Sequence, residues 1–228
     1  MTSVAERLET NLRALRALRG EGTRAPARLA ELKRWQAQRL ATTYADYAAQ
    51  PRYRAATAFF IDDLYGAKDF SSRDQAMLRI LPLMTRLLPA SAVETAALAI
   101  ELEALSEDLD HRLAAALPPG AITQDGYAQA YRVSATRAER ERQVELIDAA
   151  GHRLDEVVKK PMLGRTLTLM RRPARMAGLS DLQDFLERGF AAFREMKGAD
   201  EFLDVVKRRE TRILSGLFSG AARPFSSP

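Results

Sequence analysis

The chain has 228 residues, of which 35 are Lys or Arg and 30 are Asp or Glu, so its formal net charge is +5 at pH 7. Cysteine is absent and histidine occurs twice, which excludes a disulfide framework, a thiolate nucleophile and cysteine-based metal sites. The sequence contains no run of about 18 apolar residues, so no membrane span is predicted. The N-terminus is charged and lacks the apolar core of a signal peptide. We therefore expect a cytoplasmic protein without a transmembrane segment.

Helical periodicity runs through almost the whole sequence, and no segment shows the sustained alternation of a strand. About nine helices are expected, and a break near 133–135 would divide the sixth of them. In chain order they cover residues 4–19, 26–50, 52–65, 71–88, 90–117, 123–160, 161–177, 181–196 and 199–218.

Several boundaries carry recognisable capping signals. The segments 71–74 and 180–183 match capping boxes, in which side chains satisfy the free backbone donors of a first turn. Thr123 is expected to cap the next helix, with Ile122 and Tyr127 placed as a hydrophobic staple. After the break, the helix resumes at Thr136. These signals predict helix starts from local chemistry alone.

The connections between these helices are short, which favours antiparallel neighbours. We expect an all-α, antiparallel multi-helix bundle over residues 1–160, with a C-terminal helical segment over 161–219 packed on it. A single domain over 1–219 is the alternative. The tail over 220–228 is predicted to be disordered.

Charge is unevenly distributed along the chain. Residues 1–54 hold 11 basic and 5 acidic groups, residues 55–130 hold 5 and 11, and residues 131–228 hold 19 and 14. The simplest interpretation is that the basic ends fold onto the acidic middle. The alternative is an external acidic partner for the basic ends.

Metal and nucleophile chemistry find little support in the sequence. The pairs Asp108/His111 and Asp148/His152 lack the Glu-x-x-His spacing of di-iron helical bundles. Phosphate-binding glycine loops and a G-x-S-x-G elbow are also missing. We therefore expect no metal and no cofactor.

The strongest electrostatic feature is a basic stretch without acidic residues between Glu156 and Asp181. It is the predicted binding site for an anion or a partner. Three interpretations stay open: a solvated face paired with the acidic middle, a surface for an anionic ligand or nucleic acid, and a membrane-surface helix. The basic residues are Lys159, Lys160, Arg165, Arg171, Arg172 and Arg175.

Three carboxylates are weak catalytic candidates, because they fall close to apolar helix faces. Asp62 and Asp63 directly follow an aromatic pair, and Glu210 lies between Val206 and Ile213. A semi-buried carboxylate needs a partner, and with 29 arginines the default is an Arg–carboxylate pair. A carboxylate without its Arg would become a catalytic candidate.

The segment 59–66, Phe-Phe-Ile-Asp-Asp-Leu-Tyr-Gly, with 68–74 after it, resembles the signature of the bacterial FFLEELY-motif family. The run 177–193 is similar to that family as well. This sequence departs from the motif at Ile61, in place of Leu, and at Asp62-Asp63, in place of Glu-Glu. The resemblance implies an all-helical bacterial protein and brings no activity, cofactor or functional residue.

We expect a non-enzymatic protein that binds a protein partner or an anionic ligand. The first alternative is an enzyme that uses semi-buried carboxylate/Arg pairs on a small anionic substrate. The second is nucleic-acid or membrane-surface binding through the basic stretch.

Overall fold

The computed structural model describes residues 3–19, 27–64, 77, 80 and 90–226. These residues form ten α-helices and one π-helical segment, with no strand among them, which confirms the all-α prediction. The predicted helix over 71–88 lies almost entirely outside the described residues. The elements are α1 (Val4–Arg19), α2 (Leu29–Thr43), α3 (Ala45–Ala48), α4 (Pro51–Ala58), η1 (Phe59–Leu64), α6 (Ala90–Ala116), α7 (Gln124–Ser134), α8 (Arg137–Val158), α9 (Pro161–Met176), α10 (Ser180–Met196) and α11 (Asp200–Ser219).

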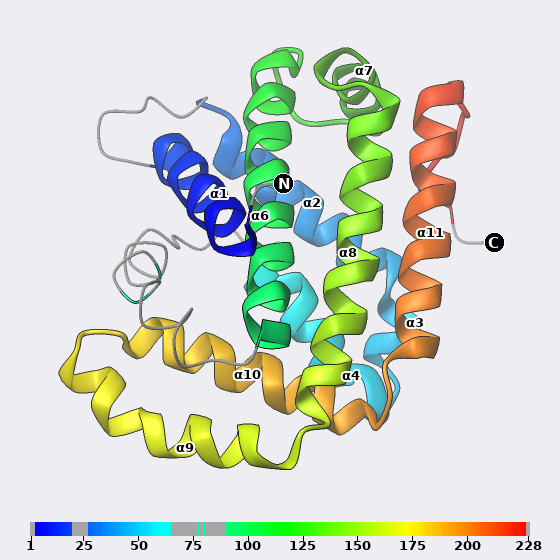
Figure 1. Ribbon diagram of the computed structural model, residues 1–228. Helices are drawn as coiled ribbons and strands as arrows, with labels where there is room; N and C mark the ends of the chain where they lie inside the picture. Colours follow the sequence, from blue (N-terminus) through cyan, green and yellow to red (C-terminus); the bar gives the residue numbers. More distant parts are fainter. Residues whose placement is uncertain (1–2, 20–26, 65–76, 78–79, 81–89, 227–228) are drawn as a thin grey trace.

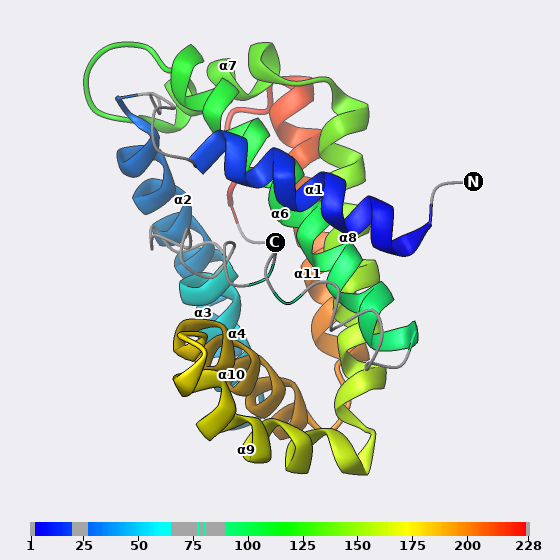
Figure 2. The ribbon, with the colours of Figure 1, turned by 60° about the vertical axis from the view of Figure 1, so that its left-hand side comes forward.

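Three long helices, α6, α8 and α11, stand side by side with alternating direction (Figure 1). Helix α1 crosses α6, and α7 lies at the end of the bundle where α6 turns into α8. Helices α9 and α10 form a layer across the opposite end, and α10 packs against α4 (Figure 2). Short connections give the predicted antiparallel order.

The capping predictions hold at the starts of both α7 and α8. The Thr123 hydroxyl accepts a hydrogen bond from the Gly126 N–H at 3.1 Å. At Thr136, the hydroxyl accepts from the Glu139 N–H at 3.2 Å, and the Glu139 carboxylate accepts from the Thr136 N–H at 2.7 Å. These reciprocal bonds satisfy donors that the first turn leaves free, and they confirm the break before Thr136.

The segment predicted as one helix over 26–50 is divided in the structure. Helix α2 ends at Thr43, and Tyr44 leaves the helical conformation before the short α3 begins. This change of direction places the Tyr44 ring in the core, with its hydroxyl donating to Glu210 at 2.9 Å. A tertiary contact therefore overrides the local preference for a continuous helix.

The capping box predicted at 180–183 is wrong. Leu179 is the N-cap of α10, and no side chain caps its first turn. The Gln183 amide instead donates to the Leu167 carbonyl and to Glu187, both at 2.7 Å. Gln183 is buried between α9 and α10, so tertiary hydrogen bonds replace the local cap.

The described part of the tail differs from the predicted disorder over 220–228. The ring of Phe225 lies edge-on to Trp35 at 5.6 Å and to Tyr127 at 5.8 Å. The backbone is also fixed, because the Arg212 guanidinium donates to the Ser226 carbonyl at 2.6 Å. Aromatic packing against α2 and α7 compensates for ordering the chain as far as residue 226.

The core joins residues from both parts of the predicted 1–160 and 161–219 division. Its largest apolar cluster contains Leu40 and Tyr53 from the first part, and Phe193 and Val206 from the second. The leucines of α6 form a seam with steps of three or four residues: Leu109 and Leu113 are fully buried, and Leu98, Leu102 and Leu105 are half-buried. Helix α6 contacts α1, α2, α7 and α8, so the seam faces several helices rather than a single partner.

Candidate functional site

Half of the predicted basic site is used within the protein. Lys159 pairs with Asp155, and Lys160 donates to the Ser91 hydroxyl at 2.7 Å. The Arg171 guanidinium makes a bidentate contact with Glu187, its shortest N–O distance being 2.7 Å. This contact holds the pKa of Glu187 at about 2, because the Arg171 and Gln183 hydrogen bonds stabilise its charged form.

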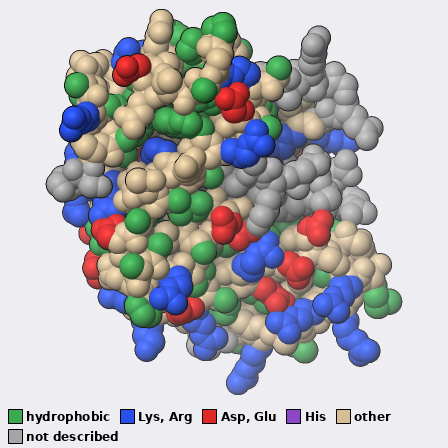
Figure 3. All heavy atoms as spheres, turned by 180° about the vertical axis from the view of Figure 1, so that it is seen from behind, with side chains coloured by type: hydrophobic (Ala, Val, Ile, Leu, Met, Phe, Trp, Pro, Cys, Tyr) green, Lys and Arg blue, Asp and Glu red, His purple; other side chains and the backbone are tan. Residues whose placement is uncertain are grey.

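The other half of the predicted site is unpaired. Arg165, Arg172 and Arg175 are exposed on α9 and have no ion pair or hydrogen bond within the described part of the chain. Figure 3 shows Lys and Arg side chains gathered along the lower edge of the molecule, the end formed by α9 and α10. Because no acidic residue occurs in α9, its outer surface carries uncompensated positive charge.

An exposed apolar stripe lies beside these arginines. Met162, Leu169 and Met176 are spaced seven residues apart, so they share one face of the helix. Their exposed fractions are 77%, 76% and 90%, which is unusual for such large apolar side chains. Arg165 and Arg172 follow the stripe at a spacing of three residues. We name this set of five residues the α9 surface.

The opposite face of α9 explains why the helix is held in place without burying that stripe. Ala174 is buried there, and the ring of Phe190 lies close to Gly164, where an added Cβ would come within 3.1 Å. The Leu167 carbonyl and Arg171 supply the polar contacts to α10 described above. Packing on α10 therefore uses one face of α9 and leaves the other face open.

The structure places the three carboxylate candidates on η1 and α11. Asp62 is exposed, whereas Asp63 is buried and accepts from Arg188 at 2.9 and 3.2 Å. Glu210 accepts from Arg39 at 2.7 Å and from the Tyr44 hydroxyl. None of them is a buried carboxylate that lacks an Arg, so the condition set for a catalytic candidate is not met.

The predicted folding of basic ends onto the acidic middle is confirmed by ion pairs across the segments. Glu107 of α6 is 4% exposed and contacts Arg19 of α1 at 2.5 Å and Lys33 of α2 at 2.8 Å. Burial raises the pKa of Glu107, but the two cations outweigh it and hold the pKa below its ordinary value. Arg142 of α8 pairs with Glu101 at 2.7 Å.

One buried and one half-buried charged residue were not distinguished in the sequence. Arg140 of α8 is 2% exposed and has no carboxylate within 4.0 Å among the described residues. Asp110 of α6 accepts from the Gln36 amide at 2.9 Å, and burial raises its pKa. Each belongs to a charged helical segment, and their helix-face periodicity was the signal that could have identified them.

The two histidines lie on different helices, His111 on α6 and His152 on α8. The His111 Nε2 atom lies 3.5 Å from Glu107, and His152 is half-buried on α8. Among the described residues, no group of three or more His, Cys, Asp or Glu side chains is arranged to hold a metal ion.

No helix in the described part of the chain combines the length and the apolar character needed to cross a bilayer. No curated protein and no solved structure matches this chain. One family model does match, over residues 15–224, and its description is "Domain of unknown function (DUF8198)". This match runs from α1 to the tail that packs on Trp35, so it includes both the bundle and the α9–α10 layer. The chain therefore belongs to the DUF8198 family.

Proposed function

We propose that this protein binds a protein partner through the α9 surface, and that the partner presents an acidic amphipathic helix. The observation that carries the proposal is the exposed stripe of Met162, Leu169 and Met176 beside unpaired arginines. Large exposed apolar side chains on a stably packed helix are typical of interaction sites. The accompanying arginines favour a partner with carboxylates next to its own apolar residues.

The dimensions of the stripe suit a helix. Residues 162 and 176 are about 21 Å apart along the axis, at about 1.5 Å per residue. A partner helix of about four turns would cover that length. Flexible methionine side chains adapt to differently shaped apolar neighbours, and they are common on surfaces that bind helices.

The composition of α9 favours a protein over a membrane or a nucleic acid. It contains no Trp, Tyr or Phe, which are the side chains that anchor interfacial helices in a bilayer and stack on bases. An apolar stripe at the centre of the α9 surface would also make no favourable contact with the phosphate groups of a partner. We retain the sequence-based proposals of a cytoplasmic location and of a relationship to the bacterial FFLEELY-motif proteins, which rest on the residues quoted for them.

A defined helical peptide tests the proposal. The probe carries Leu on one face with flanking Glu residues, and fluorescence anisotropy measures its binding. We expect it to bind at least tenfold more tightly than a scrambled peptide of the same composition or a version with Lys in place of Glu. The variants M162Q/L169Q/M176Q and R165Q/R172Q should each weaken binding at least tenfold.

Matched controls come from exposed residues elsewhere. Val133 is 72% exposed on α7, and Arg208 is exposed on α11. The substitutions Val133→Gln and Arg208→Gln should leave peptide binding unchanged. Equal binding of the acidic and scrambled peptides would contradict the proposal. Tighter binding to anionic vesicles or to duplex DNA than to the acidic peptide would assign the surface to a membrane or a nucleic acid instead.

A further inference from the structure

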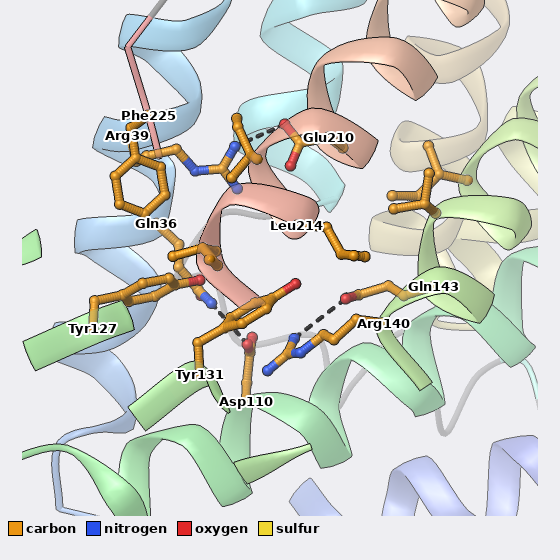
Figure 4. Close-up of a pocket in the computed structure, with 14 residues that line it drawn as sticks. Gln36, Arg39, Asp110, Tyr127, Tyr131, Arg140, Gln143, Glu210, Leu214 and Phe225 are labelled. Atoms are coloured by element: carbon orange, nitrogen blue, oxygen red, sulfur yellow. Dashed lines mark hydrogen bonds and ion pairs between the residues drawn. The ribbon is translucent and has the colours of Figure 1, made fainter. Parts of the chain in front are cut away.

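A small pocket lies in the end of the bundle remote from α9, where α2, α6, α7, α8 and α11 meet (Figure 4). Phe225 of the tail lines one side of it. The volume of the pocket is about 50 Å³. By the same measure, a single buried water needs about 10–15 Å³. The pocket can therefore hold a few waters or a ligand of a few heavy atoms.

Arg140 is the most unusual residue of this pocket. Its guanidinium lies over the Tyr131 ring, 4.2 Å from the ring centre, and Nη1 donates to the Gln143 side-chain oxygen at 3.3 Å. The Nε and Nη2 atoms are buried and have no hydrogen-bond partner. A cation buried with two free donors is unfavourable unless something else in the pocket accepts from them.

A second arginine supplies another free donor. Arg39 donates through Nη1 to Glu210, but its Nε atom is buried without a partner. Figure 4 shows Arg39 and Arg140 reaching the pocket from different helices, α2 and α8. The unpartnered atoms of the two arginines are all N–H donors, so a complementary ligand must bring acceptors.

The positions of the free atoms on Arg140 indicate the shape of that ligand. Nε and Nη2 are on the same edge of a guanidinium, where their two N–H bonds point in nearly the same direction. A carboxylate accepts from such an edge with both of its oxygens. We propose that the pocket is a binding site for a small carboxylate, held by the Nε/Nη2 edge of Arg140 and by Nε of Arg39.

The charges around the pocket favour a single negative charge on the ligand. Glu210 already balances Arg39 at 2.7 Å, so Arg140 is the cation left to be neutralised. Asp110 also lines the pocket, and burial raises its pKa. A doubly charged phosphate would meet both carboxylates in a pocket of this size. The apolar side chains of Ile213 and Leu217 leave room for a short aliphatic end only.

This inference is independent of the α9 surface, because the pocket and that surface are at opposite ends of the bundle and share no residue. A partner that binds α9 needs no pocket ligand. The two proposals can therefore fail separately.

Titration with acetate and propionate at constant ionic strength tests the site. Trp35 stacks on Tyr127 with ring centres 4.3 Å apart, and Tyr127 lines the pocket, so the fluorescence of this single tryptophan reports on ligand entry. We expect a saturable change with a midpoint in the millimolar range or below. Chloride and inorganic phosphate should bind at least tenfold more weakly.

The Nε–H resonances of the arginines give a second readout on the unaltered protein. Acetate should shift the Arg140 and Arg39 Nε–H signals and slow their exchange with water. The absence of a saturable response in both measurements would overturn the proposal and leave water as the occupant. An equal response to chloride would also overturn it, since a halide needs no two-oxygen fork.

Two variants locate the effect. Arg140→Met should weaken acetate binding at least tenfold, and Arg140→Lys, which keeps the charge and loses the fork, should weaken it by a similar factor. Arg142→Met is the matched control, because Arg142 is on the same helix with its side chain half exposed and paired with Glu101. Unchanged acetate binding by a folded Arg140→Met protein would overturn the assignment.

Discussion

Glu107 and Asp110 are three residues apart on α6, but among the described residues only Glu107 has cations within hydrogen-bonding distance. Glu107 faces two cations, Arg19 and Lys33, at hydrogen-bonding distance. Around Asp110, the nearest donor is the neutral Gln36 amide, and Arg140 is left without a carboxylate. The first cluster is complete within the protein. The second has free donors and space beside them, which is what a binding site requires.

The largest expected effect comes from breaking the complete cluster. Glu107→Leu removes the buried carboxylate that the half-buried Lys33 and Arg19 both contact, so the free energy of unfolding should fall by about 3–5 kcal/mol. Urea denaturation followed by Trp35 fluorescence measures the change. Asp108→Asn, on the exposed side of the same helix, is the control and should cost less than about 1 kcal/mol. Equal losses of stability for Glu107→Leu and Asp108→Asn would contradict the expected difference between a buried and an exposed carboxylate.

The incomplete cluster should respond in the opposite direction. Arg140→Met replaces a buried cation that has two free donors with an apolar side chain of similar length. In carboxylate-free buffer we expect the free energy of unfolding to be unchanged or to rise by up to about 4 kcal/mol. Urea denaturation without and with acetate measures both states. A loss as large as that of Glu107→Leu would mean that Arg140 is already satisfied within the protein.

The tail should make a smaller contribution. Phe225→Ala removes a half-buried ring from Trp35 and Tyr127, and the expected loss of stability is about 1–2 kcal/mol. Because Phe225 lines the pocket, the variant should also exchange ligand faster in stopped-flow fluorescence. Phe218, half-buried against Tyr131, provides the comparison, since Phe218→Ala should lower stability without speeding exchange. An unchanged rate of ligand exchange in the Phe225→Ala protein would mean that the ligand enters the pocket by another route.

Ligand affinity should depend on pH through Asp110. Its pKa is raised by burial, and the charged groups around it are Lys33, Arg140 and Glu107, with the Tyr127 hydroxyl also close. Protonation removes a negative charge beside the bound anion, so affinity for formate should rise as the pH falls toward the raised pKa of Asp110. Asp110→Asn should flatten this profile. An affinity for formate that rises with increasing pH would contradict the expected direction.

The smallest effect is expected at the α9 surface. The triple variant M162Q/L169Q/M176Q changes side chains that are already in solvent, so the free energy of unfolding should stay within about 0.5 kcal/mol of the original. Thermal denaturation checks this. A larger loss would show that the stripe is covered within the protein, and would contradict its proposed role.

Much of the fold could be predicted from the sequence, because helix limits depend on nearby residues. The start of α8 is an example: Thr136 and Glu139 satisfy each other's backbone donors within one turn. The failures occurred where a distant group competed. The Gln183 amide donates a hydrogen bond to α9 instead of capping the start of its own helix. The Tyr44 hydroxyl donates to Glu210 across the bundle. Phe225 packs on α2 and α7, which are remote in sequence.

The candidate sites divide in the same way. The arginines of α9 were identified from the sequence, since a stretch without acids is visible in one dimension, yet three of the six predicted residues turned out to have partners within the protein. The unpaired Arg140 was not identified. Pairing is a property of distances between helices, and no spacing along α8 shows whether a carboxylate from α6 or α11 reaches its guanidinium.

The sequence by itself determined an all-helical chain, most of its helix limits and the segregation of charge, because each follows from interactions within a few residues or from composition. The tertiary structure decided which charges compensate each other. It gave Glu107 two cations and Arg140 no carboxylate. It also decided which face of α9 is covered. Both outcomes depend on how helices from distant parts of the chain pack, and that packing fixes where an unsatisfied donor or an exposed apolar stripe remains.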